Sequence, residues 1–298
     1  MVRLEFSIEL SYEVLDNSCD FIFNIHPAVT QCQKILSETL SITPSAEPQV
    51  FIHQPDGTRY MRLTGHFGPL HIRYTGVLEI LHINANPGDL KEMRVVDLPL
   101  DVISYIYPSR YCQSDQLRIL ANKKFGNLLP GYDRVCTIRD WVNNTIKFIS
   151  GSSAESTSAL ETLADQAGVC RDFAHLMITL CRALNIPARF VSSIDYGADP
   201  LLGPTDFHAY VEVFLSGRWY LFDPSGVCPT MGLLRLGTGR DAADVPFAMV
   251  FGSVVSSAAL ISIQATENEK KGIVLPVRQS KALSTANSAN TSYHRFHN

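Results

Sequence analysis

Residues 167–184 read Ala-Gly-Val-Cys-Arg-Asp-Phe-Ala-His-Leu-Met-Ile-Thr-Leu-Cys-Arg-Ala-Leu, and the interpretation of the whole chain starts from them. Gly168 indicates a tight turn, and the apolar residues after it recur at helical spacing. They are Phe173, Leu176, Met177, Leu180, Cys181 and Leu184. This stripe predicts a helix that buries one face. Pro187 lies just beyond the helix and marks its end, because proline cannot continue a helix.

Cys170 precedes that stripe, in the first turn of the predicted helix. A thiol there lies among free backbone N–H groups at the positive end of the helix dipole, and both favour the reactive thiolate. Free cysteine is also among the residue types most often buried for packing alone. Cys170 is therefore either a nucleophile or a small core residue. Cys112, in a loop, is a second candidate nucleophile.

The residues just before Cys170 favour an exposed thiol. A helix is expected over residues 133–146, where apolar residues again follow helical spacing. Ser158 and Glu161 fit a capping box for a short helix that ends near Gln166. Gly168 interrupts that helix, so the chain stops one helix and starts another immediately before Cys170.

Composition restricts the class of protein. The chain has 298 residues, of which 46% are hydrophobic and 18% charged, as in soluble globular proteins. Its formal net charge is −4, so the chain has no excess of basic residues that could bind the phosphate backbone, and we expect no nucleic-acid partner. Seven cysteines without a Cys-x-x-Cys pair suggest reduced thiols and a cytoplasmic location.

We expect neither a signal peptide nor a membrane span. In residues 1–9, apolar residues alternate with charged and polar ones, and they form no continuous apolar segment. The longest uncharged run, residues 247–263, is interrupted by glycine and serine and is short for a bilayer. A buried strand and turn are the expected structure of that run.

Three segments are predicted. Residues 1–105 contain strand patterns separated by turns such as Pro55-Asp56-Gly57, which indicates a β-rich, sandwich-like domain. Their five histidines are irregularly spaced, so we expect no metal site there. Residues 106–265 form the second domain. Residues 266–298 are polar and are expected to be a flexible tail, in which His294 and His297 have no evident partner ligands.

Two strands near residue 215 bring polar side chains together. Phe207–Leu215 and Arg218–Asp223 are joined by Ser216-Gly217, which predicts a hairpin with a two-residue loop. If Leu215 pairs with Arg218, Asp223 lies opposite Tyr210. His208 then shares their face and is a diagonal neighbour of Asp223, about 7–8 Å away at the backbone.

A cysteine at a helix start followed by histidine and aspartate on neighbouring strands is the order of a thiol triad. Cys170 would attack a carbonyl, His208 would move the proton, and Asp223 would orient the imidazole. The Cys170 backbone N–H, at the helix start, would supply one donor to the oxyanion.

At these residues the sequence closely resembles the transglutaminase-like superfamily, in particular its bacterial two-domain proteins with a β-rich N-terminal domain. The matching motifs are Gly168-Val169-Cys170-Arg171-Asp172-Phe173-Ala174-His175-Leu176, Asn185-Ile186-Pro187-Ala188-Arg189-Phe190-Val191, Asp206-Phe207-His208-Ala209-Tyr210 and Trp219-Tyr220-Leu221-Phe222-Asp223-Pro224. The resemblance implies a papain-like α+β catalytic fold and places the triad on Cys170, His208 and Asp223.

The resemblance leaves the reaction open. We expect a cysteine peptidase or amidase that hydrolyses an amide or peptide bond through a thioester. The alternatives are transglutaminase-type acyl transfer to an amine and a non-catalytic peptide-binding protein. No EF-hand-type run is present, so we expect no metal and no cofactor. Weaker candidates for oxyanion or cleft residues are Gln166, Tyr111 and Asp172.

Overall fold

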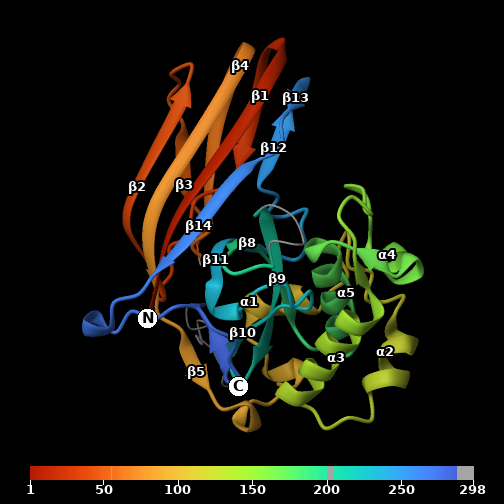
Figure 1. Cartoon of the computed structure of the whole chain (residues 1–298). Helices are drawn as coiled ribbons and strands as arrows, with labels where there is room; N and C mark the ends of the chain where they lie inside the picture. The colour runs from red at the N-terminus through yellow and green to blue at the C-terminus, as the bar shows by residue number, and fades with distance from the viewer. Residues whose placement is uncertain (55, 200–204, 287–298) are drawn as a thin grey trace, which may run out of the picture.

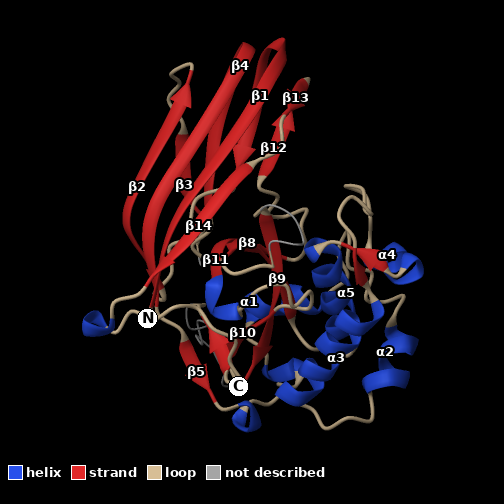
Figure 2. Cartoon of the chain, viewed as in Figure 1, coloured by secondary structure: helices blue, strands red, loops and turns tan. Residues whose placement is uncertain are grey.

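The computed structural model describes residues 1–54, 56–199 and 205–286 (Figure 1). A sheet of long strands projects beyond the rest of the molecule, and a smaller central sheet lies beside the longer helices (Figure 2). Antiparallel sheets combined with a separate group of helices confirm the predicted α+β class, with a β-rich N-terminal part before the helical part.

The central sheet carries the predicted hairpin. Within the described residues its strand order is β10-β9-β8-β11, and all neighbours are antiparallel. The strands are β8 (Ala188–Asp195), β9 (Phe207–Leu215), β10 (Arg218–Phe222) and β11 (Leu233–Gly239). Leu215 pairs with Arg218, and Ser216 and Gly217 have φ angles of 46° and 84°, as a two-residue hairpin turn requires. The predicted hairpin and its register are confirmed.

The helices are α1 (Leu100–Ile103), α2 (Arg118–Phe125), α3 (Tyr132–Thr145), α4 (Ala159–Asp165) and α5 (Cys170–Ala183). α5 packs on one face of the central sheet and contacts α2, α3 and α4, whereas Val102 of α1 packs with Phe214 and Trp219. α5 is buried from Asp172 onward and shares a core with the sheet residues Phe190, Val211 and Val213. The helix predicted after Gly168 is confirmed. Residues 114–117, just before α2, form turns.

The N-terminal sheet contains β1 (Val2–Phe23), β2 (Gln33–Thr43), β3 (Gln49–Ile52) and β4 (Arg59–Ile80), of which β1 and β4 have 22 residues each. The pairing of β1 with β4 shifts register between Val14 and Ser18. This irregularity lets the strand continue through the exposed residues 15–18.

The uncharged run near residue 250 returns to the N-terminal sheet. It forms β12 (Ala248–Phe251), β13 (Val254–Ser256) and β14 (Leu260–Thr266). All three pair with β1, at successive positions along the edge opposite β4. The run forms strands as expected, but their residues are exposed or half-buried because these strands lie at the edge of the sheet.

Residues 267–281 of the predicted tail are mostly exposed, whereas the last described residues pack against the molecule. β15 (Ala282–Ser284) pairs with β5 (Ile83–Ala85), and residues 282–286 are buried. Two shorter strands, β6 (Lys147–Phe148) and β7 (Ala167–Gly168), pair in parallel just before α5. His294 and His297 lie outside the described residues.

The two sheets share apolar packing. Ile194, Leu234 and Leu236 of the central sheet belong to the same buried cluster as the inward-facing residues of β1 and β4. Among the described residues, no helix is long and apolar enough to cross a bilayer.

Candidate active site

The first turn of α5 is fixed by the side chain of Asp172. Its Oδ2 accepts a hydrogen bond of 2.8 Å from the Val169 N–H, and its Oδ1 lies 3.2 Å from the Arg171 guanidinium. The carboxylate is fully buried. A Cβ on Gly168 would lie only 2.7 Å from the Asp172 Cβ, so this approach requires glycine. Asp172 therefore holds the helix start in shape beside Cys170.

Cys170, the first residue of α5, faces the start of β9. Its Sγ lies 3.9 Å from the carbonyl oxygen of Phe207, within the range of a weak thiol hydrogen bond. Unlike the buried Cys112 and Cys181, Cys170 is partly exposed. His208 follows Phe207, and its side chain interacts with the Cys170 thiol.

His208 and Asp223 form a buried ion pair. His208 Nε2 lies 3.5 Å from Asp223 Oδ2, and the two residues are only 5% and 6% exposed. The distance is long for an N–H···O hydrogen bond, so the contact is chiefly electrostatic. Asp223 Oδ1 also accepts hydrogen bonds from the Ser225 N–H at 3.0 Å and from the Ser225 hydroxyl at 2.6 Å.

The electrostatics of this pair favour its charged form. Burial would lower the pKa of His208, but the Asp223 charge and contacts with Asp223 and Cys170 raise it well above its usual range. Burial would raise the pKa of Asp223, but the charge of His208 and the hydrogen bonds from Ser225 lower it. The imidazolium and the carboxylate therefore stabilise each other.

The weaker oxyanion and cleft candidates Tyr111 and Gln166 lie in surroundings that differ from those of Cys170 and His208. The Tyr111 ring stacks on His175, with centroids 4.9 Å apart, and its backbone N–H donates to Asp241. Gln166 ends α4 in a left-handed conformation, with φ at 52° and an exposed side chain. Among the described contacts, neither side chain touches Cys170 or His208.

The rival nucleophile Cys112 lies in the core. It is fully buried, and its thiol donates to the His175 carbonyl oxygen at 3.5 Å. Burial raises its pKa to about 12, so the thiolate form is disfavoured. Cys112 therefore behaves as a packing residue.

Sequence reasoning missed three residues around Asp223. Cys228 donates a weak hydrogen bond to Asp223 Oδ2 at 3.8 Å, and Ser225 holds the other oxygen. Asp195, at the end of β8, interacts with both His208 and Asp223 and is 5% exposed. The spacing of Asp223 and Ser225 is a recognisable turn signal. Cys228 and Asp195 have no such signal.

A polar cavity of about 400 Å³ opens behind the pair. Asp223 and Cys228 lie in its wall, as do the basic residues Arg139, Arg278 and Lys281. The cavity is lined by α3, by the loop after β10 and by the C-terminal segment that leads into β15.

Two family models match the chain. Residues 118–224 match the transglutaminase-like superfamily, and residues 2–101 match the N-terminal domain of bacterial transglutaminase. A crystal structure from Cytophaga hutchinsonii, provisionally named as a cysteine protease, superposes with a TM-score of 0.88. It is 37% identical, and the match covers 95% of this chain and 97% of that one.

Curated mycobacterial proteins are also similar. An uncharacterised Mycobacterium leprae protein is 28% identical over 53% of this chain and 57% of its own length. An uncharacterised Mycobacterium tuberculosis protein is 33% identical over 45% of this chain and 46% of its own length. The chain thus spans about half the length of the curated relatives it matches.

Proposed function

Since this chain belongs to the transglutaminase-like superfamily, we propose that it is a thiol-dependent hydrolase of amide or peptide bonds. The observation that carries the proposal is the meeting of Cys170, at the start of α5, with the buried His208–Asp223 ion pair. The provisional name of the Cytophaga hutchinsonii protein supports the same reaction class.

In the proposed reaction, His208 takes the proton of the Cys170 thiol, and Sγ attacks the substrate carbonyl carbon. The carbonyl oxygen becomes an oxyanion, and the Cys170 backbone N–H at the helix start supplies one donor to it. Collapse breaks the C–N bond, His208 gives its proton to the leaving amine, and a thioester remains. Water, deprotonated by His208, then releases the acid and restores the thiol. Asp223 keeps the imidazole oriented throughout.

Turnover of a peptide library, followed by mass spectrometry, tests this proposal. We expect Cys170→Ala to abolish cleavage and Cys136→Ala, a change at another partly exposed cysteine, to leave it intact. Cleavage that continues at the normal rate in Cys170→Ala would disprove the assignment of the nucleophile. A correctly folded wild-type protein that binds peptides without cleaving them would support the binding alternative.

Acyl transfer to an amine is the second candidate. The match of residues 2–101 to the N-terminal domain of bacterial transglutaminase favours it. The thioester is common to both reactions, so the second nucleophile decides the product. Reactions of glutamine-containing peptides with and without a primary amine separate the two, because transfer yields the substituted amide and hydrolysis yields the acid.

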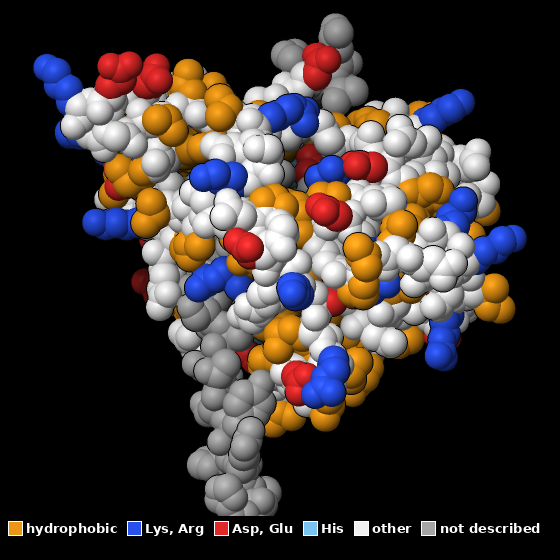
Figure 3. Space-filling model, turned by 90° about the horizontal axis from the view of Figure 1, so that it is seen from below, with side chains coloured by type: hydrophobic (Ala, Val, Ile, Leu, Met, Phe, Trp, Pro, Cys, Tyr) orange, Lys and Arg blue, Asp and Glu red, His pale blue; other side chains and the backbone are white. Residues whose placement is uncertain are grey.

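We also propose a cytoplasmic enzyme that acts on peptides or proteins without a required cofactor. All seven cysteines are free, which supports a reducing compartment. On the face displayed in Figure 3, acidic and basic side chains are interspersed rather than gathered by sign. This mixture supports the proposal that nucleic acid is not a partner.

A further inference from the structure

Three potential metal ligands converge behind the proposed catalytic groups. They are His208 Nε2, Asp223 Oδ2 and Cys228 Sγ, and these atoms all lie within 4.8 Å of one another. The Asp223 oxygen is 3.5 Å from the His208 nitrogen and 3.8 Å from the Cys228 sulfur. The three residues come from β9, from the residue after β10 and from the loop that follows.

Within residues 1–54, 56–199 and 205–286, two buried polar atoms at this cluster have no hydrogen-bond partner, although one of them makes the long ionic contact with Asp223. They are His208 Nε2 and Asp195 Oδ2, and each residue is 5% exposed. Asp195 interacts electrostatically with His208 and Asp223, and its side chain contacts Cys228. Buried polar atoms without partners are rare because each loses its contacts with water. Their position beside a thiol and a carboxylate indicates a place for a cation.

The donor types and separations suit zinc. Zinc accepts imidazole nitrogen, thiolate sulfur and carboxylate oxygen at bond lengths of about 2.0–2.3 Å in a tetrahedral arrangement. Such bonds place neighbouring donor atoms roughly 3.3–3.8 Å apart. The two separations from Asp223 Oδ2, 3.5 Å and 3.8 Å, fall in this range, and His208 Nε2 and Cys228 Sγ lie within 4.8 Å of each other.

We propose that His208, Asp223 and Cys228 form a zinc-binding site, with Asp195 beside it, and that bound zinc holds the enzyme inactive. The cavity of about 400 Å³ reaches both Asp223 and Cys228 and provides an entry path. Arg139, Arg278 and Lys281 in its wall repel cations, so we expect slow uptake.

Zinc binds a neutral imidazole nitrogen and a thiolate, so binding releases the protons of His208 Nε2 and Cys228 Sγ. Because the metal occupies Nε2 and engages Asp223, His208 no longer exchanges a proton in the acid–base cycle. The inhibitory effect rests on the proposed function, whereas metal binding does not.

Binding is measured first, in full-length Cys170→Ala protein, so that the proposed nucleophile cannot supply a ligand. Co²⁺ serves as the spectroscopic probe and Zn²⁺ as its competitor. We expect one Co²⁺ per chain, a thiolate-to-cobalt absorption band and displacement by Zn²⁺. Adding Cys228→Ala should remove the band, whereas adding Cys136→Ala should leave it unchanged. Absence of the band from Cys170→Ala, or its persistence after loss of Cys228, overturns the site.

Inhibition is measured separately, as the rate of Cys170 alkylation by a haloacetamide, which needs no substrate. We expect prolonged incubation with Zn²⁺ to slow alkylation at least tenfold in wild type and a chelator to restore it. Cys228→Ala should resist this effect, and Cys136→Ala should behave like wild type. If Co²⁺ binds but alkylation stays unchanged, the site stands and its inhibitory role is rejected. Failure to find a substrate would bear only on the proposed hydrolysis.

Discussion

At the scale of single residues, the contact between Cys170 and His208 depends on how each backbone segment ends. α5 begins at Cys170, and Phe207, the first residue of β9, offers its carbonyl oxygen to the thiol. The side chain of His208 is held on its other side by Asp223. Small changes at either segment end should therefore affect the reactivity of the thiol more than the fold.

The first prediction concerns the pH dependence of Cys170 alkylation. Because Asp223 and Cys170 raise the pKa of His208, the imidazole keeps its proton as the pH rises through neutrality. A positive charge beside Sγ favours the thiolate. We expect alkylation to stay fast well below pH ~8.5, the ordinary thiol range. In His208→Gln the rate should fall and its pH profile should move to higher pH.

His71→Gln is the matched control, since His71 lies on an exposed face of β4 and touches Ser11. Its profile should coincide with that of wild type. Peptide mass mapping assigns the alkylated cysteine. A wild-type profile centred on the ordinary thiol range would show that His208 does not activate Cys170.

A second prediction concerns Gly168→Ala. The added Cβ would meet the Asp172 Cβ at 2.7 Å, so the carboxylate or the helix start must move. Overpacking of this kind costs about 1–3 kcal/mol of unfolding free energy. We expect that loss in urea unfolding, together with slower alkylation of Cys170. Gly88→Ala, where a Cβ meets nothing within 4 Å, should change neither measurement.

Some residues of the candidate site could be predicted from the sequence, and others could not. Cys170, His208 and Asp223 follow from a helix start and a hairpin register, which are both local patterns. Cys228 and Asp195 reach Asp223 only because the loop after β10 and the end of β8 pack together. Their positions depend on tertiary packing, which no single stretch of the sequence specifies.

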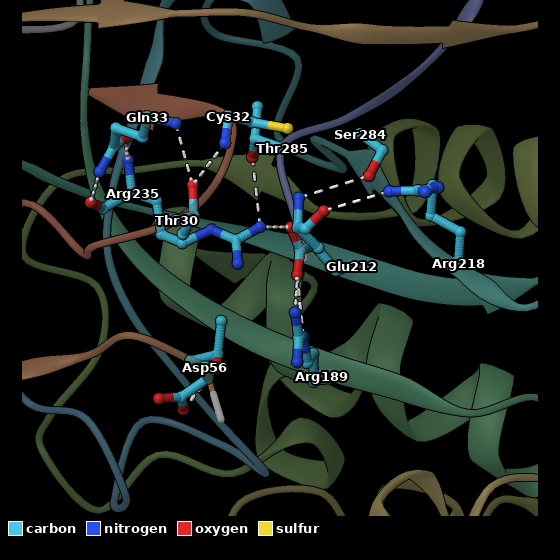
Figure 4. Close-up of polar contacts among 12 residues, drawn as sticks. Thr30, Cys32, Gln33, Asp56, Arg189, Glu212, Arg218, Arg235, Ser284 and Thr285 are labelled. Atoms are coloured by element: carbon cyan, nitrogen blue, oxygen red, sulfur yellow. Dashed lines mark hydrogen bonds and ion pairs between the residues drawn. The ribbon is translucent and has the colours of Figure 1, made fainter. Parts of the chain in front are cut away.

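At the scale of secondary-structure elements, β9 connects the site to the rest of the molecule through Glu212. Figure 4 shows this carboxylate between Arg189 of β8 and Arg235 of β11. The Arg235 backbone N–H donates to the Gln33 side chain at 3.1 Å, and its guanidinium donates to Thr285 at 3.2 Å. One buried ion-pair network thus joins the central sheet, the N-terminal sheet and the C-terminal segment.

A third prediction follows for Glu212→Gln. Glu212 is fully buried, so the substitution leaves two buried arginines without their counter-charge. Breaking a buried ion pair costs about 3–5 kcal/mol. We expect a loss of this size in urea unfolding. Asp97→Asn, which breaks the exposed pair with Arg94, should leave the transition unchanged. Equal effects of the two substitutions would show that the Glu212 network adds no special stability.

The elements themselves were predictable to different degrees. Local signals such as the capping box at Ser158 and the Ser216-Gly217 turn led to correct elements. The length of β1 could not be predicted, because the polar residues near position 16 are typical of a loop and remain in the strand only through a register shift against β4. The strands β12–β14 were expected to be buried, but they lie at an edge.

At the scale of the whole molecule, the domain boundaries expected from the sequence cut through one sheet. Residues 248–265 fall in the range predicted for the catalytic domain, yet they pair with β1. Shared apolar packing between β11 and the N-terminal sheet adds to this connection. In the chain, the proposed catalytic residues thus lie between β1–β4 and β12–β14, which are strands of one sheet.

A fourth prediction concerns fragments. We expect residues 106–265 expressed alone to aggregate, because β12–β14 would lack β1 and present unpaired strands. Expressed with residues 1–105, the fragment should become soluble and elute with its partner in size-exclusion chromatography. Residues 106–246, which lack these strands, should aggregate less than 106–265. If the isolated 106–265 fragment is soluble and monomeric, the pairing with β1 does not control its solubility.

The position of β14 also determines when the protein can finish folding during synthesis. β1 is synthesised before β12–β14, and residues 106–247 are made between them. A nascent chain that stops before β12 therefore carries an uncovered edge along β1, a surface prone to association with other chains. Closure of this edge requires synthesis to continue through β14, so interrupted chains differ from longer ones by the exposure of this edge.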